Sequence, residues 1–168
     1  VTFNAAPIGV APLGEDRALV EAALVSAEAR SEGYTAPARA LGLALDYFRD
    51  RPFTAARVVL LVSDGGATLS QDNRDRIAAL LRERRAALIW IYTRGEQEPS
   101  IRVPKGRETE SLSMHEFFAS IGTPYEMFEV IDSAGLERAV LLARVAELRG
   151  VRVRRGDDWV RSGWQIIR

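Results

Sequence analysis

The sequence contains no cysteine and only one histidine, His115. Without cysteine, the chain can form no disulfide, offers no thiolate nucleophile and cannot hold zinc through sulfur. A single histidine excludes a histidine cluster around a metal and leaves one candidate for a catalytic triad. His115 is predicted to lie in the first turn of a capped helix, so we interpret it as structural. Because thiols give no indication of compartment, cytoplasm and periplasm both stay open.

Long apolar runs are missing as well. Val58–Val62 is among the longest, and it is far shorter than the roughly 20 residues that a membrane-spanning helix requires. The chain is therefore predicted to contain no membrane span, although flanking sequence could anchor it. The first residues, Val1–Asn4, lack the basic and apolar regions of a signal peptide and resemble the end of a core strand.

Neither sign of charge is in excess. Lysine and arginine together number 23, as do aspartate and glutamate, and the formal net charge is +0. Such a chain has no overall field that attracts nucleic acid or acidic lipid. The arginine-rich stretches Arg82–Arg85 and Arg152–Arg155 are interpreted as solvated surface. The predicted partner is a protein and not a nucleic acid.

The common catalytic motifs are absent too. The chain has no Gly-x-Gly-x-x-Gly after a strand, no Gly-x-x-x-x-Gly-Lys-Ser/Thr loop and no Gly-x-Ser-x-Gly turn. These motifs mark dinucleotide binding, phosphate binding and acyl transfer. We therefore predict that the chain is not an enzyme, and keep an enzyme with an unrecognised carboxylate site as the least favoured hypothesis.

What the sequence does contain is an alternation of apolar strands and amphipathic helices. Hydrophobic residues make up 47% and charged residues 27%, which is typical of a folded globular chain. Arg57–Ser63 and Ala87–Thr93 are unbroken apolar runs, which predict adjacent strands buried on both faces of a parallel sheet, with Arg57–Ser63 in a central position. Tyr125–Ile131 predicts a further strand. The fold class is therefore α/β, with helices on both faces of the sheet.

Helical spacing of apolar residues and N-cap residues predict the helices. Their expected ranges are Glu15–Arg30, a helix after Thr35 that stops before Pro52, Gln71–Arg85 with Ser70 as N-cap, a short helix that starts with a capping box of Ser113 and Glu116, and a helix from Ser133 to about Arg149. The proline- and glycine-containing stretch Arg94–Ser111 predicts a long loop.

Two oxygen-bearing side chains stand where ligand sites of α/β sheets usually form. Asp64 directly follows the predicted strand Arg57–Ser63, and ligands collect at the carboxyl ends of parallel strands. Thr35 precedes a helix, where its hydroxyl could cap backbone amides or face a hard cation. A turn residue at Asp64 and a cap at Thr35 remain the structural alternatives.

The order of these features resembles the von Willebrand factor A (vWA) family over Val1 to about Leu148. A Gly-x-Thr before a helix is followed by an apolar strand that ends in Ser-Asp-Gly. The resemblance implies a three-layer, Rossmann-like fold with a mainly parallel sheet. It also implies a metal-ion-dependent adhesion site (MIDAS), in which Thr35 and Asp64 hold Mg²⁺ or another divalent cation and a protein partner completes the coordination.

The same resemblance places the family's first strand, first helix and Asp-x-Ser-x-Ser loop before Val1, and the chain contains no such loop elsewhere. Two oxygen side chains replace few of the waters around Mg²⁺, so the cation is expected to bind weakly or not at all. Thr35 and Asp64 are still expected to lie close together at one edge of the sheet.

A narrower resemblance begins in the second half of the chain. Ser113–Tyr125, Phe128-Glu129 and Leu136–Ala139 are similar to vWA proteins encoded with bacterial methanol oxidation, the MxaC type. This resemblance implies an accessory role in assembly or metal loading of a periplasmic dehydrogenase, with a periplasmic or membrane-associated location.

The predicted organisation is a vWA-like domain over residues 1–148, truncated at its N-terminus, and a basic tail over residues 149–168 that contains Trp159 and Trp164. The leading hypothesis is a protein-interaction module that binds near Thr35 and Asp64. The alternative is a metal-independent scaffold that binds through the tail, which is expected to form a hairpin docked on the sheet edge, a partner contact or a replacement terminus.

Overall fold

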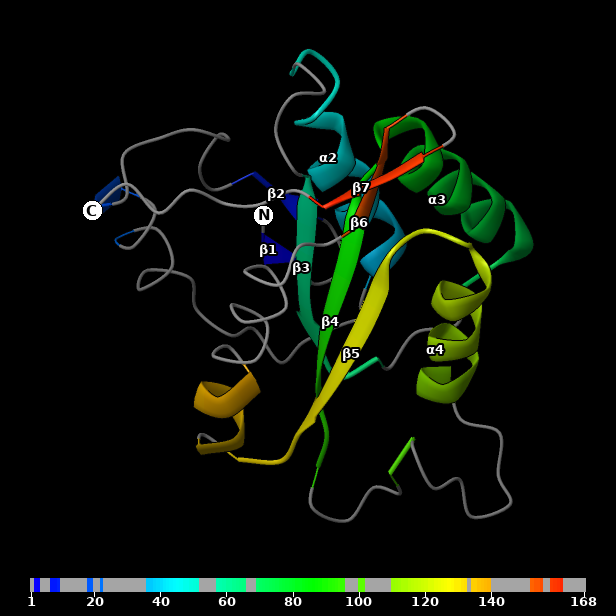
Figure 1. Ribbon diagram of the computed structural model, residues 1–168. Coiled ribbons are helices and arrows are strands. Elements are labelled where there is room, and N and C mark those ends of the chain that lie inside the picture. The colour runs from blue at the N-terminus through cyan, green and yellow to red at the C-terminus, as the bar shows by residue number, and fades with distance from the viewer. Residues whose placement is uncertain are drawn as a thin grey trace.

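The computed structural model describes most of the central part of the chain and pieces of both ends (Figure 1). The described residues are 2–3, 7–9, 18–19, 22, 36–51, 57–65, 69–95, 100–101, 110–132, 134–139, 152–155 and 158–161. Their elements in chain order are β1 (Thr2–Phe3), β2 (Pro7–Ile8), α2 (Pro37–Asp46), β3 (Val58–Ser63), α3 (Gln71–Arg84), β4 (Ala87–Thr93), α4 (Glu110–Ser120), β5 (Tyr125–Val130), β6 (Arg152–Arg155) and β7 (Asp158–Arg161).

The centre of the molecule is a parallel sheet with the strand order β3-β4-β5. Val59 pairs with Leu88 in β4, and Trp90 pairs with Met127 in β5. All but the last residue of β4 are buried, as expected for a strand covered on both faces. The predicted α/β class and the parallel pairing of the two apolar strands are therefore confirmed.

Helices lie on both faces of this sheet. The main core fills the face toward α2, α3 and α4, and includes Leu41 of α2, Leu81 of α3, Trp90 and Phe118 of α4. A smaller cluster on the other face joins Ile91 and Val130 to Ala139, in the helical segment 134–139. Burial of the large side chains of the main core supplies most of the driving force for this arrangement.

The prediction that Arg57–Ser63 forms a central strand buried on both faces is wrong. Within the described residues β3 is an edge strand, since it pairs with β4 and with no other described strand. Val59 and Leu61 are buried against the helices, but Leu60 is 51% exposed and Val62 is 46% exposed. The run is apolar on both faces, while only one of these faces is covered.

Each end of the chain contributes a separate two-stranded antiparallel sheet, β1 with β2 and β6 with β7. Thr2–Phe3 is thus a strand as predicted, although its described partner is β2 rather than the central sheet. The tail does form a hairpin, but β6 and β7 pair with each other and not with an edge of the central sheet. The proposed boundary at residue 148 falls outside the described residues.

The helix caps test the finer sequence predictions. Ser70 is the N-cap of α3, where its side chain accepts a hydrogen bond from the Asn73 amide, as predicted. The capping box at Ser113 is wrong, because α4 begins earlier, at Glu110, and Ser113 Oγ instead accepts a hydrogen bond of 2.7 Å from Arg74. The start of α4 also shortens the predicted loop Arg94–Ser111.

Two further expectations are only partly covered by the structure. Ser133, the predicted cap of the last helix, lies outside the described residues; Asp132 Oδ1 accepts the Gly135 amide at 2.6 Å and so caps that helix. In the predicted helix Glu15–Arg30, Ala18, Leu19 and Ala22 are helical, but Leu19 is exposed rather than facing the core. In the parts of the chain that the structure describes, no helix is long and apolar enough to cross a membrane.

Candidate functional site at the carboxyl edge of the sheet

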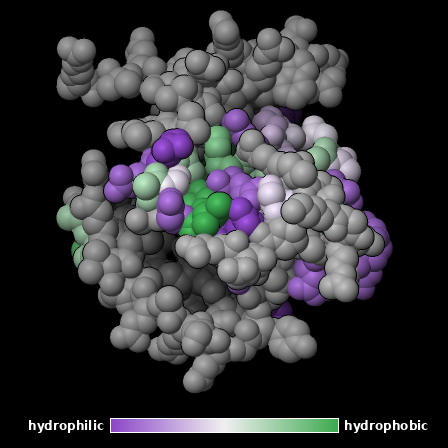
Figure 2. All heavy atoms as spheres, turned by 90° about the horizontal axis from the view of Figure 1, so that it is seen from below, coloured by the Kyte–Doolittle hydropathy of each residue, from purple (hydrophilic) through white to green (hydrophobic). Residues whose placement is uncertain are grey.

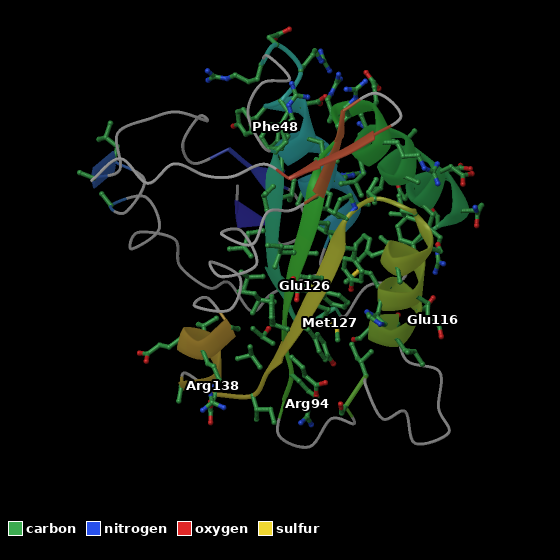
Figure 3. The ribbon with its side chains drawn as sticks, in the orientation of Figure 1. Phe48, Arg94, Glu116, Glu126, Met127 and Arg138 are labelled. Atoms are coloured by element: carbon green, nitrogen blue, oxygen red, sulfur yellow. The ribbon has the colours of Figure 1, made fainter. Side chains whose placement is uncertain are left out.

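The carboxyl ends of β3, β4 and β5 meet at one edge, because the three strands are parallel. Asp64 follows β3, Arg94 follows β4, and Ile131 with Asp132 follows β5. Figure 3 shows Arg94 at this edge and Phe48 at the opposite one. Figure 2 looks onto the carboxyl edge from below and shows a small hydrophobic area between hydrophilic residues. This is the edge at which open α/β sheets bind ligands.

The backbone around Asp64 is held in place by its neighbours. Gly65 has a φ of +69°, and a Cβ at this position would lie 2.8 Å from Trp90 Cζ2 and 2.9 Å from Ser111 Oγ. Ser111 Oγ donates a hydrogen bond of 3.2 Å to the carbonyl oxygen of Asp64. Trp90 Nε1 donates to Ser63 Oγ at 3.2 Å. A larger residue after Asp64 would crowd both side chains and take a strained φ, so this turn favours glycine.

This turn leaves Asp64 on the surface. Asp64 is exposed, and Ser111 Oγ holds its backbone carbonyl. A rim carboxylate on a rigid backbone can accept hydrogen bonds from a partner or ligate a hard cation without a change in the fold. The role of Asp64 as a metal ligand stays a prediction.

Thr35, the other predicted ligand, lies outside the described residues, so its distance from Asp64 remains a prediction. The helix after it begins at Pro37 with Ala36 as N-cap, which makes no side-chain capping hydrogen bond. Helix α2 runs back toward the start of β3 (Figure 1), so its first residues point toward the carboxyl edge.

A second polar group at this edge was missed from the sequence. Arg94 Nε and Glu129 Oε1 form an ion pair of 2.5 Å, and both side chains are nearly buried, at 13% and 11% exposure. Ser100 Oγ donates a hydrogen bond of 2.7 Å to the second oxygen of Glu129. The pair ties the ends of β4 and β5 to the loop that contains Ser100. A glutamate inside a predicted strand was the available signal, since an unpaired buried carboxylate is rare.

The described part of the carboxyl edge offers few metal ligands. No group of three or more histidine, aspartate or glutamate side chains able to hold a metal occurs among the residues that the structure describes. Glu129 is paired with Arg94, and Asp132 caps a helix. Asp64 is an exposed carboxylate at this edge, and one carboxylate with water ligands binds Mg²⁺ only weakly.

The segment that carries the narrower resemblance is mainly structural. His115 Nδ1 lies 2.9 Å from Tyr125 Oη, which links α4 to β5. Burial raises the pKa of Tyr125 above its usual value of 10.0. Phe117 and Phe118 pack in the core. The predicted structural role of His115 agrees with this contact, and these residues account for the packing of α4 rather than for a partner surface.

Comparisons with known proteins add little to this description. No protein-family model and no curated protein matches the chain. A solved structure of an uncharacterised membrane-spanning protein from Vibrio fischeri aligns with a TM-score of 0.41 and 22% identity, over 86% of this chain and 73% of that chain. A likeness of this degree carries no inference about fold family or function.

Proposed function

We propose that this chain is a protein-binding domain of the vWA type whose binding surface is the carboxyl edge around Asp64. The observation that carries the proposal is the exposed carboxylate of Asp64 on a turn fixed by Gly65, Trp90 and Ser111. The contacts of Ser111 and Trp90 restrain the turn, which would lower the conformational entropy lost on binding. The same position at the end of an apolar parallel strand supports the vWA resemblance.

A role in binding is favoured over an enzymatic one by the chemistry of the edge. The described ionisable groups beside Asp64 are engaged in structure, Glu129 with Arg94 and Asp132 with the Gly135 amide. His115, the chain's one histidine, contacts Tyr125. A general acid or base needs a group free to exchange protons with a substrate.

A divalent cation, Mg²⁺ or a similar ion, would be a weak addition to this surface. Asp64 and Thr35 are the proposed ligands, with water filling the remaining positions. The accessory role in maturation of a periplasmic dehydrogenase, and a periplasmic or membrane-associated location, rest on the MxaC-type resemblance of Ser113–Tyr125 and remain part of the proposal.

The second candidate is a metal-independent scaffold that binds through residues 149–168. It is favoured by one observation, the β6–β7 hairpin, which forms a sheet of its own. Such a hairpin offers backbone edges to a partner strand, independently of Asp64.

The cation is tested by titrating Mn²⁺ into ¹⁵N-labelled protein, because a paramagnetic ion broadens nearby amide signals even when it binds weakly. We expect the amides of Gly65 and Ser111 to broaden first in the wild type and to stay sharp in Asp64→Asn. Asp132→Asn is the matched control, since it removes a charge from the same edge and keeps a capping side chain. Equal broadening in Asp64→Asn and the wild type would refute a cation at Asp64.

The partner surface is tested by affinity capture with the folded chain, in excess Mg²⁺ and in excess chelator. We expect a partner that binds the wild type and Asp132→Asn but not Asp64→Asn. Partner binding that survives Asp64→Asn and chelator, but disappears when residues 149–168 are removed, would move the function to the tail.

A further inference from the structure

The hairpin of β6 and β7 (Figure 1) sorts its residues onto two faces of different chemistry. In its register Arg152 pairs with Arg161, and Arg154 pairs with Trp159. Residues that pair directly across an antiparallel ladder share a face, as do residues two positions apart along one strand. Three arginines and a tryptophan therefore belong to one face of the hairpin, which we call the Arg–Trp face.

The opposite face of the hairpin, which we call the valine face, has a different composition. Val153 pairs with Val160, and Arg155 pairs with Asp158. An apolar pair gains free energy from burial, and opposite charges across a strand pair favour pairing. Arginine, in contrast, is rarely buried in a protein interior. The valine face is therefore suited to packing, whereas the Arg–Trp face is suited to a charged ligand.

The sequence between the two strands supports this register. Gly156-Asp157 separates the paired residues Arg155 and Asp158. A two-residue connection that begins with glycine is typical of tight hairpin turns, and the length of the turn determines which residues pair. A slip of one residue would bring Val160 onto the face that holds the arginines. The separation of arginine from valine is thus a property of the observed pairing.

Charge is distributed unevenly along this neutral chain. Residues 149–168 contain six arginines and two aspartates, a net charge of +4. Residues 1–148 contain 17 basic and 21 acidic residues, a net charge of −4. A basic segment at one end of a chain is typical of proteins that bind polyanions. The neutral total, which favours solvated surface as the interpretation of Arg152–Arg155, does not reveal this difference.

The combination of arginine and tryptophan favours one class of polyanion. A guanidinium group pairs with phosphate through two hydrogen bonds, and an indole ring offers a surface on which a base can stack. A single strand leaves its bases free to stack, whereas a duplex keeps them inside the helix. An acidic protein or a membrane of anionic lipid would be held mainly by the charges. Single-stranded nucleic acid uses both the arginines and Trp159.

We infer that the Arg–Trp face of the β6–β7 hairpin binds single-stranded nucleic acid. Arg152, Arg154 and Arg161 bind phosphates, and one base stacks on Trp159. Binding is independent of base sequence, because phosphates and ring faces are common to all nucleotides. This inference does not depend on the proposed role of Asp64. It also differs from the second candidate function, in which the backbone edges of the hairpin bind a protein strand.

The probes are short oligothymidine and oligouridine strands labelled with fluorescein, and their binding to the full chain is followed by fluorescence anisotropy. We expect both strands to bind. The logarithm of the association constant should fall with the logarithm of the salt concentration with a slope of about −2, as three phosphate contacts on a single strand require. A duplex of the same length should bind several-fold more weakly.

Two neighbouring arginines on opposite faces give a matched pair of variants. Arg154→Gln removes a charge from the Arg–Trp face, so binding should weaken several-fold and the salt slope should become shallower by about 0.7. Arg155→Gln removes the same charge from the valine face and should change the affinity by less than about twofold at physiological salt.

Trp159 tests the stacking contact. Trp159→Ala should weaken binding about tenfold at every salt concentration, whereas Trp159→Phe keeps a ring and should retain most of the affinity. Asp64→Asn should leave binding of the oligonucleotide unchanged, so that failure of this inference and failure of the proposed function are distinguishable.

Three results would overturn the inference. The first is an anisotropy that stays constant up to high micromolar protein in low salt. The second is equal weakening in Arg154→Gln and Arg155→Gln, which would indicate that net charge alone attracts the strand. The third is tighter binding of polyglutamate, or of vesicles that contain phosphatidylserine, without any effect of Trp159→Ala. An acidic protein or a membrane surface would then be the partner.

Discussion

The two edge strands of the central sheet, β3 and β5, differ in the side chains that they carry. At the β5 edge, Glu129 pairs with Arg94 and Ser100, and Tyr125 contacts His115 of α4. The exposed Glu126 adds a charge to the same strand (Figure 3). At the β3 edge, Leu60 and Val62 are exposed and no charge interrupts the strand. Both strands pair only with β4 among the described strands, but Glu129 and Tyr125 of β5 have side-chain partners within the chain, whereas the exposed side chains of β3 are apolar.

This difference shows what can be inferred from an apolar strand sequence. The sequence VVLLVS indicates that the strand is suited to an apolar environment on both faces. The sequence does not indicate whether elements of the same chain cover both faces of the strand. Glu129 and Tyr125 of β5, in contrast, have partners within the chain.

The largest expected effect concerns the ion pair between Glu129 of β5 and Arg94. Glu129→Leu leaves the nearly buried guanidinium of Arg94 without its carboxylate, and should lower the free energy of unfolding by about 3 kcal/mol. Arg94→Leu should cost a similar amount, and the double variant should cost clearly less than the sum of the two. Urea unfolding followed by circular dichroism measures all three. Glu126→Gln, on the same strand but exposed, is the control and should change stability by less than about 0.5 kcal/mol.

The next largest loss of stability is expected from substitutions in the turns beside the two edge strands. Gly65 follows β3 and Gly122 precedes β5, and both have positive φ, +69° and +78°. An alanine at Gly122 meets no atom within 4 Å, so Gly122→Ala should cost only backbone strain, about 1 kcal/mol. Gly65→Ala would also crowd Trp90 and Ser111, and should cost about 2 kcal/mol or more. Equal losses in the two variants would show that the turn at Asp64 is not crowded.

Much of the central architecture could be predicted from the sequence, because hydrophobic pattern and local capping determine it. The run Ala87–Thr93 and the Ser70 cap both gave the observed boundaries of their elements. Asp64 could be placed at the carboxyl edge, because it directly follows the last residue of a strand in a parallel sheet. These features depend on residues close together in the chain.

The errors came from long-range side-chain contacts. Ser113 matched a capping box locally, but Arg74, which is distant in sequence, binds its hydroxyl instead. The Arg94–Glu129 pair depends on the register of β4 against β5, which no local pattern contains. The exposure of β3 depends on which other elements cover it. Sequence pattern gives the preference of a residue, and only the assembled fold gives its partner.

Tyr125, at the start of β5, should give a pH-dependent effect that the β3 edge lacks. Burial raises the pKa of its phenol in the folded state above the unfolded value of 10.0. The unfolded chain therefore loses this proton first as pH rises, so stability is unaffected below pH 10.0 and falls above it. Tyr125→Phe should remove that alkaline loss, at a neutral-pH cost of about 1 kcal/mol for the contact with His115. Urea unfolding measured at neutral and at alkaline pH, with Tyr47→Phe as control, tests this; an unchanged alkaline slope in Tyr125→Phe would contradict it.

The smallest effect is expected at the exposed side chains of β3. Leu60→Thr and Val62→Thr keep branched side chains, which suit a strand, on a face that is about half exposed. Each should change the free energy of unfolding of the isolated chain by less than about 0.5 kcal/mol. The neighbouring Leu61 is only 4% exposed, so Leu61→Ala should cost about 3 kcal/mol in the same urea experiment. A cost near that of Leu61→Ala at Leu60 would mean that the chain covers this face itself. A near-zero cost would mean that the exposed side chains of β3 add little to the stability of the isolated chain.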